Sequence, residues 1–124
     1  MPRALGIRVT SLARKKVTGE MRITPLHLNV NGGVNGGAIM SFADALGAIG
    51  AVANRPPGYR GGTIESKTNF FAAGTGPVLS AVCVPLHIGR TTSVWQTTIT
   101  NADGRMVAIV TQTQIAVPAK SDIE

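Results

Sequence analysis

The most regular hydrophobic pattern in the chain runs from Gly36 to Ala53. Ile39, Phe42, Leu46 and Ile49 recur there at spacings of three and four residues. This is the spacing of one face of an α-helix. The sequence Asn-Arg-Pro-Pro-Gly follows directly and is a strong stop signal for a helix. The pattern therefore predicts one long, nearly all-apolar helix near the middle of the chain.

Short β-rich runs lie on both sides of this predicted helix. Two precede it, Leu5–Val9 and Lys16–Ile23. Four follow it: Thr63–Phe71, Val78–Ile88, Thr91–Thr100 and Met106–Val117. The last four are joined by the tight-turn sequences Gly-Thr-Gly, Gly-Arg and Asp-Gly, which predict an antiparallel meander. Pro85 within the second of them indicates a bulge or an edge position.

Asp44 is the only side chain with a formal charge between Ile23 and Asn54. At about 100° per residue it projects away from the bulky apolar face of the helix. The residues that share its own face are small or unbranched: Gly37, Met40, Ser41, Gly47, Ala48 and Ala51. A solvent-facing helix surface usually carries Lys and Glu instead, so we expect another element or another subunit to cover this face. A carboxylate in such surroundings is either a satisfied structural group or a functional one.

The loop before the helix contains the Asn-Gly-Gly sequence twice. Its second copy leads into the predicted start of the helix, where backbone N–H groups lack intrahelical partners and stabilise negative charge. Glycine allows a ligand to approach the backbone closely at such a place. The loop and Asp44 together suggest a site for attack on a carbonyl, while a merely mobile loop is the alternative interpretation.

Composition places few limits on this hypothesis. The 124 residues with 44% hydrophobic and 15% charged content are expected to form a single domain, 1–124, with a core at about 5–117. A lone Cys83 and the lack of a signal-peptide pattern favour a cytoplasmic protein. Two distant His and one Cys predict no metal site. The apolar run holds a carboxylate and two internal glycines, so we expect no membrane span.

The net charge of +6 arises largely near the N-terminus. The basic residues there are Arg3, Arg8, Arg14, Lys15, Lys16 and Arg22, with Glu20 alone opposing them. No aromatic residue lies among them, which argues against nucleic acid as the partner. A small polyanionic ligand or a plain solubilising surface fits the charge equally well.

The helix and its loop resemble a motif of hotdog-fold thioesterases of the 4-hydroxybenzoyl-CoA and phenylacetyl-CoA (PaaI-like) type. That motif is Asn-x-x-Gly-x-x-His-Gly-Gly, then six residues, then Asp or Glu. With every spacing kept, the matching residues here are Asn29, Gly32, Asn35, Gly36, Gly37 and Asp44. The stretches GGTIESKTNFFAAGTG, HIGRTTSV and NADGRMVAIVTQT resemble later parts of the same family. The resemblance implies an α+β hotdog fold, in which a curved antiparallel sheet of about six strands wraps one central helix.

The resemblance also implies an activity, the hydrolysis of an acyl- or aryl-CoA thioester without a cofactor. Asp44 would attack the carbonyl or act as base on a water, while the N–H of Gly36 or Gly37 would hold the carbonyl oxygen. Asn29 would help to hold the substrate or the water, and Thr63 would position the water. In the family these groups converge across the interface of a homodimer or homotetramer, the loop of one subunit facing the Asp of the other.

Two further residues belong to the implied substrate site. Asn35 stands where the family has a His, and Asn cannot serve as a general base. Arg90 lies in a turn where it could contact a CoA phosphate, although a solvated turn arginine is the simpler interpretation.

Two other functions stay open on the sequence. A non-catalytic acyl-CoA-binding or regulatory hotdog domain would explain the change at Asn35. A hydratase or dehydratase would need a His at the site, and only His27 could supply it.

Overall fold

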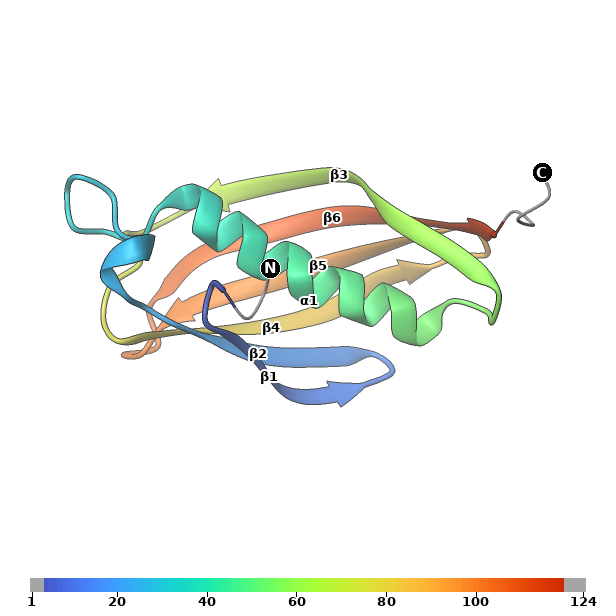
Figure 1. Cartoon of the computed structure of the whole chain (residues 1–124), viewed down its shortest axis with the longest axis horizontal. Helices are drawn as coiled ribbons and strands as arrows, with labels where there is room; N and C mark the ends of the chain where they lie inside the picture. The colour runs from blue at the N-terminus through green and yellow to red at the C-terminus, as the bar shows by residue number, and fades with distance from the viewer. Residues whose placement is uncertain (1–3, 120–124) are drawn as a thin grey trace.

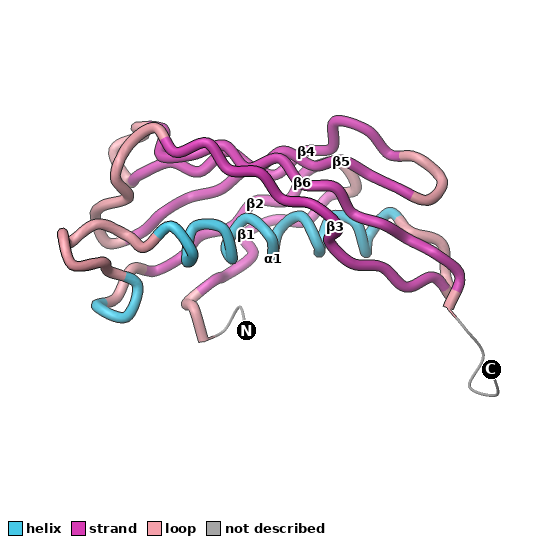
Figure 2. Tube along the Cα trace, turned by 90° about the horizontal axis from the view of Figure 1, so that it is seen from above, coloured by secondary structure: helices cyan, strands magenta, loops and turns pink. Residues whose placement is uncertain are grey.

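The computed structural model describes residues 4–119 and shows a six-stranded antiparallel sheet curved around one long helix (Figure 1). The elements, in chain order, are β1 (Ile7–Ala13), β2 (Lys16–Arg22), the 3-10 turn Pro25–His27, α1 (Gly36–Asn54), β3 (Tyr59–Phe70), β4 (Val78–Ile88), β5 (Thr92–Asn101) and β6 (Met106–Pro118). Figure 2 shows the helix lying lengthwise along one face of the sheet. This confirms the predicted α+β hotdog architecture.

The core lies between α1 and the sheet. Ile39, Phe42 and Leu46 of the predicted apolar face are buried, and Ile49 is partly buried. Trp95 of β5 approaches the helix so closely that a Cβ at position 50 would lie 2.7 Å from its ring. Gly50 therefore lets the helix rest on the indole. By length and mean hydropathy of 1.5, α1 could cross a membrane, but here its apolar face is used to close this core.

The four later strands do not form the expected four-stranded meander. β4, β5 and β6 do, but β3 pairs with β6 at the far side, so the strand order is β1-β2-β4-β5-β6-β3. The residues between β3 and β4 are thus a crossing loop, in which the Gly74 carbonyl accepts a hydrogen bond from Val34 N–H at 2.9 Å. The prediction of a tight turn at Gly74-Thr75-Gly76 was wrong because the local sequence does not specify which strands become neighbours.

Strand boundaries differ from prediction mainly at the two edges of the sheet. β1 begins after Gly6, whose φ of 75° favours glycine, and continues to Ala13. β3 begins four residues earlier than expected, at Tyr59. Pro85 lies at an irregularity in the pairing of β4 with β5, which confirms the predicted bulge.

The basic residues near the N-terminus lie on the β1–β2 hairpin, at the opposite edge of the sheet from β3 (Figure 1). Arg8 is paired with Glu20 at 2.6 Å. Arg3 lies outside the described residues. The basic residues of the β1–β2 hairpin are therefore separated by the width of the sheet from β3, which carries Thr63.

Candidate active site

Asp44 is held by two hydrogen-bond donors from the neighbouring strands β3 and β6. Thr63 of β3 donates its hydroxyl to Asp44 Oδ1 at 2.7 Å, and the Gln112 side chain of β6 donates from Nε2 to the same oxygen at 3.3 Å. Gln114, two residues further on, donates from Nε2 to Thr63 Oγ1 at 2.6 Å. The structure thus brings Asp44 and Thr63 together, two residues separated by 19 positions in the sequence.

The face of α1 that carries Asp44 is open in the single chain. Asp44 and Met40 are exposed, while Gly47 is buried against Gln112. Among residues 4–119, Asp44 Oδ2 has no hydrogen-bond partner. A carboxylate that is anchored through one oxygen and free at the other can meet a carbonyl carbon or a water molecule.

The N-terminal turn of α1 has one free donor. Asn35 is the N-cap residue: its side-chain Oδ1 accepts a hydrogen bond from Gly37 N–H at 2.7 Å. Its backbone carbonyl accepts hydrogen bonds from the N–H groups of Ala38 and Ile39. Within the part of the chain that the structure describes, only Gly36 N–H in this turn has no acceptor. Of the two glycines predicted to hold a carbonyl oxygen, Gly36 is therefore the one whose N–H is available.

Asn29 closes the loop before the helix. Its side-chain Oδ1 accepts hydrogen bonds from the N–H groups of Asn31 and Gly33, at 2.9 and 3.1 Å. Asn29 N–H also donates to the Gly33 carbonyl. These contacts give Asn29 a role in loop shape, and they leave its amide nitrogen available for a ligand.

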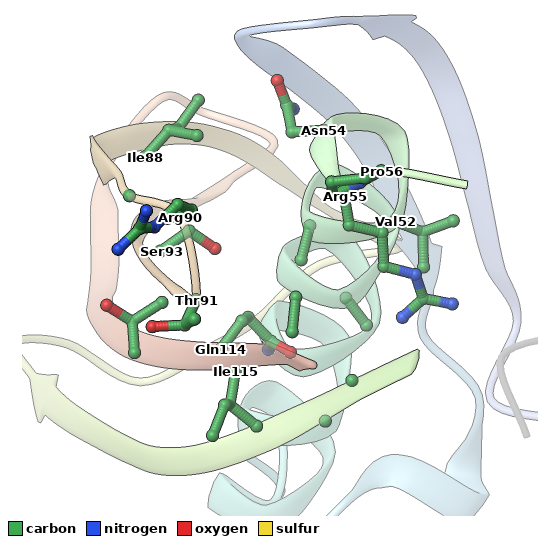
Figure 3. A pocket seen from close by; sticks show the side chains of 17 residues that line it. Val52, Asn54, Arg55, Pro56, Ile88, Arg90, Thr91, Ser93, Gln114 and Ile115 are labelled. Carbon is green, nitrogen blue, oxygen red and sulfur yellow. The ribbon is translucent and has the colours of Figure 1, made fainter. Parts of the chain in front are cut away.

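A cavity of about 150 Å³ continues from the Asp44 face toward the C-terminal end of α1. Ala48 and Ala51 form its helix side, and Gln114 forms part of its floor. Arg90 lies on one side of it and the end of the helix with Arg55 on the other (Figure 3). No Asp or Glu lines this cavity, so its charged groups are both cationic.

His27 and Cys83 are structural residues. His27 is buried, its Nδ1 accepts from Thr24 N–H at 3.0 Å, and its Nε2 donates to the Leu5 carbonyl at 2.6 Å. Both ring nitrogens are thus engaged, so His27 cannot serve the hydratase alternative. Burial raises the pKa of the Cys83 thiol, which keeps it neutral within the core.

Three residues of the site were not predicted from the sequence: Arg55, Gln112 and Gln114. The two glutamines continue the inward phase of β6 beyond Val110, and both are buried. A polar residue in the phase of core positions is the signal that could have found them. Arg55 belonged to the helix stop sequence, and nothing local set it apart.

A curved sheet around one helix, with an anchored carboxylate beside a cationic cavity, defines a hotdog-fold enzyme. Residues 31–108 match the family model described as the Thioesterase superfamily. The chain is 31% identical over 102 residues to the proofreading thioesterase EntH of Cronobacter turicensis, with 82% of this chain and 74% of EntH covered. It is 25% identical over 105 residues to the 1,4-dihydroxy-2-naphthoyl-CoA hydrolase of Listeria monocytogenes, with 85% of each covered.

A solved structure supports the same assignment. A hypothetical thioesterase protein with coenzyme A from Streptococcus pneumoniae superposes with a TM-score of 0.82 at 27% identity, covering 93% of this chain and 88% of that one. The chain belongs to the Thioesterase superfamily and is a thioester hydrolase.

Proposed function

We propose that this protein is a cytoplasmic acyl-CoA thioesterase that hydrolyses an acyl- or aryl-CoA thioester to the free acid and CoA. The observation that carries the proposal is the Asp44 carboxylate, anchored through Oδ1 by Thr63 and Gln112 with Oδ2 left free. The relatives named as a CoA hydrolase and a thioesterase support the substrate class.

The Gly36 N–H at the start of α1 polarises the thioester carbonyl. As the tetrahedral intermediate forms, this N–H and the helix dipole stabilise the negative oxygen. Gly37 and Asn35 contribute by fixing the geometry of the turn through the cap. Asn29 holds the preceding loop in place and presents its amide to the substrate or the water.

Asp44 then delivers the nucleophile in one of two ways. As a base it takes a proton from water, the new hydroxide oxygen bonds to the carbonyl carbon, and the C–S bond breaks as the thiolate receives that proton. As a nucleophile it bonds to the carbon itself, the CoA thiolate leaves, and water hydrolyses the resulting anhydride. A single turnover in heavy-oxygen water tests for the second route, because label enters the Asp44 carboxylate only when water attacks the Asp44 carbonyl of the anhydride.

The CoA phosphates are bound at the cationic cavity. Arg90 and Arg55 lie on opposite sides of it, and no carboxylate competes for them there (Figure 3). Guanidinium groups suit phosphate because they offer several N–H donors in a fixed plane. The coenzyme A in the similar structure from Streptococcus pneumoniae supports this choice of ligand.

The active form is a homodimer, or a tetramer built from two such dimers, joined at β3. This strand pairs with β6 on one side only, so its other edge offers free backbone groups to a second copy. Two of its exposed side chains are large and apolar, Ile64 at 58% and Phe70 at 52%. A second copy at this edge would cover the open face around Asp44.

The test is thiol release from a panel of acyl-CoAs by the native protein and by Asp44→Ala and Asp44→Asn. Loss of the carboxylate is expected to lower kcat by roughly 10²–10⁴, as for removal of a general base or nucleophile. Asp103→Ala, which removes a carboxylate from the β5–β6 turn, is the matched control and keeps full activity.

Undiminished hydrolysis by Asp44→Ala would contradict the mechanism. Tight CoA binding by the native protein without thiol release for any substrate would instead favour the non-catalytic acyl-CoA-binding domain. Light scattering that shows a monomer at assay concentration would contradict the shared site.

A further inference from the structure

Two buried glutamines of β6 form a polar wall behind Asp44. Gln112 and Gln114 are only 1% and 3% exposed. Gln112 reaches Asp44 directly, whereas Gln114 reaches it through Thr63, with the hydrogen bonds of 3.3, 2.6 and 2.7 Å described above. Side-chain amides are rare at fully buried positions. Gln112 and Gln114 occupy consecutive inward positions of β6, which indicates a specific role for them.

The directions of these hydrogen bonds follow from the chemistry of the acceptor. An ionised carboxylate only accepts, so both Gln112 and Thr63 must donate to Asp44 Oδ1. The one proton of the Thr63 hydroxyl is therefore committed to Asp44, and its oxygen can only accept from the Gln114 N–H. The Thr63 hydroxyl thus donates to Asp44, and the role in positioning a water that the family resemblance implies stays a prediction.

Gly47 shapes the space for the Gln112 amide. A Cβ at position 47 would lie 2.4 Å from Gln112 Cδ and Nε2, so any larger residue would displace the carboxamide. Gln112 Oε1 is also buried without a hydrogen-bond partner among the described residues. An unpaired buried carbonyl is costly. Among the described residues, the hydrogen bond of this side chain is made by the other end of the amide, which donates to Asp44.

We infer that Gln112 and Gln114 are positioning residues, which fix Asp44 by Oδ1 and so select Oδ2 as the oxygen that reacts. Gln112 acts by direct donation, and Gln114 acts by orienting the Thr63 hydroxyl. This inference rests on the proposed function, because it assigns these residues to the same reaction at Asp44. It adds a prediction of its own: each donor matters only while the Asp44 carboxylate is present.

The experiment is a set of double-mutant cycles with Asp44→Ala. Gln112→Met and Thr63→Val keep the approximate shape of each side chain but remove its donor. Each is expected to lower kcat by roughly tenfold or more, the effect of losing a hydrogen bond to a charged group, with KM and CoA binding nearly unchanged. In the Asp44→Ala background the same changes should have no further effect on kcat.

Two variants test the direction of the effect. Thr63→Ser restores the hydroxyl and is expected to recover kcat to within about threefold of native, because only the donor is required. Gly47→Ala adds the methyl group that displaces the Gln112 amide, and we expect it to lower kcat about as much as Gln112→Met. Gln96→Met on β5, which makes the same substitution on a neighbouring strand, is the control and leaves kcat unchanged.

The failures of the two proposals are distinguishable. If Asp44→Ala itself hydrolyses acyl-CoA at the native rate, the proposed function fails. If Asp44→Ala is inactive but Gln112→Met and Thr63→Val keep native kcat, or lower kcat equally in both backgrounds, only the positioning role fails. Far-ultraviolet circular dichroism and CoA binding are measured for each variant to check that it is folded. If a variant has lost its fold, Gln112→Asn replaces it, because the shorter side chain no longer brings the amide to Asp44. The same changes in kcat are expected for Gln112→Asn.

Discussion

The two functional parts of α1 are built in opposite ways. At its N-terminal turn the useful group is a backbone donor, Gly36 N–H, which is left free because Asn35 caps the next donor. At its middle the useful group is a side chain, Asp44, held by Thr63 of β3 and Gln112 of β6. The first part is shaped by local sequence and the second by tertiary contacts.

The separation of these parts bears on whether one chain alone could form the proposed site. Asp44 lies eight positions after Gly36 in the helix, which places the two residues about 12 Å apart along its axis. A thioester carbon must lie about 3 Å from the nucleophile while its oxygen meets the N–H donor. Both groups of a single helix cannot meet those conditions, so the comparison supports a site that takes one part from each of two copies.

After the loss of the Asp44 carboxylate, the largest effect is expected from removing the donor at the N-terminal turn. Gly36→Pro deletes its N–H but suits the backbone, because proline is accepted at the first helical position and Asn35 already has the extended ψ of 134° that precedes a proline. We expect kcat to fall by roughly 10²–10³, as for loss of an oxyanion donor.

Gly36→Ala is the matched control because it keeps the N–H. Its Cβ would meet the half-exposed Phe70 ring at 3.1 Å, a contact that a small ring movement relieves. Activity of Gly36→Ala should stay within a few fold of native. Equal activities of the Pro and Ala variants in steady-state thiol release would show that the Gly36 N–H does not act on the carbonyl.

A smaller effect, but a more decisive one, is expected from mixing two inactive proteins. Asp44→Ala chains keep an intact helix start, and Gly36→Pro chains keep an intact carboxylate. After subunit exchange, half of the dimers are mixed and each mixed dimer has one intact site, so about a quarter of native activity should return. Exchange is followed with two differently tagged chains, and mixed dimers without recovered activity would mean that each site lies within one chain.

The same contrast explains what the sequence could predict. The helix, β4 and the Asp44 position follow from periodicity and turn residues, which act over a few residues. The place of β3 does not, because its pairing with β6 is decided by the curvature of the whole sheet around α1. The motif spacing located Asp44 and Gly36, but the motif lies outside β6 and could not indicate Gln112 or Gln114.

The predicted role of Thr63 shows the limit of family resemblance. The resemblance implied that its hydroxyl positions a water, and the structure places that hydroxyl 2.7 Å from Asp44 Oδ1. Its second contact, with a residue 51 positions away, Gln114, could not be predicted from Thr63 alone. A family resemblance indicates which residues lie near one another. The hydrogen bonds that each of them makes depend on neighbours elsewhere in the chain.

The smallest effect concerns Asn35, which contributes to the N-terminal turn in two separable ways. Asn35→Ala removes the cap on Gly37 N–H and is expected to cost about 1 kcal/mol of folding free energy. Asn35→Asp keeps an acceptor for that N–H and adds a negative charge that the helix dipole stabilises, so its melting temperature should equal or exceed that of the native protein. The same charge opposes a developing negative oxygen at Gly36, so kcat should fall several-fold. Thermal unfolding and thiol release measured on both variants test this, because a role in capping alone would make stability and activity change together, whereas a role beside the carbonyl makes them change in opposite directions in Asn35→Asp.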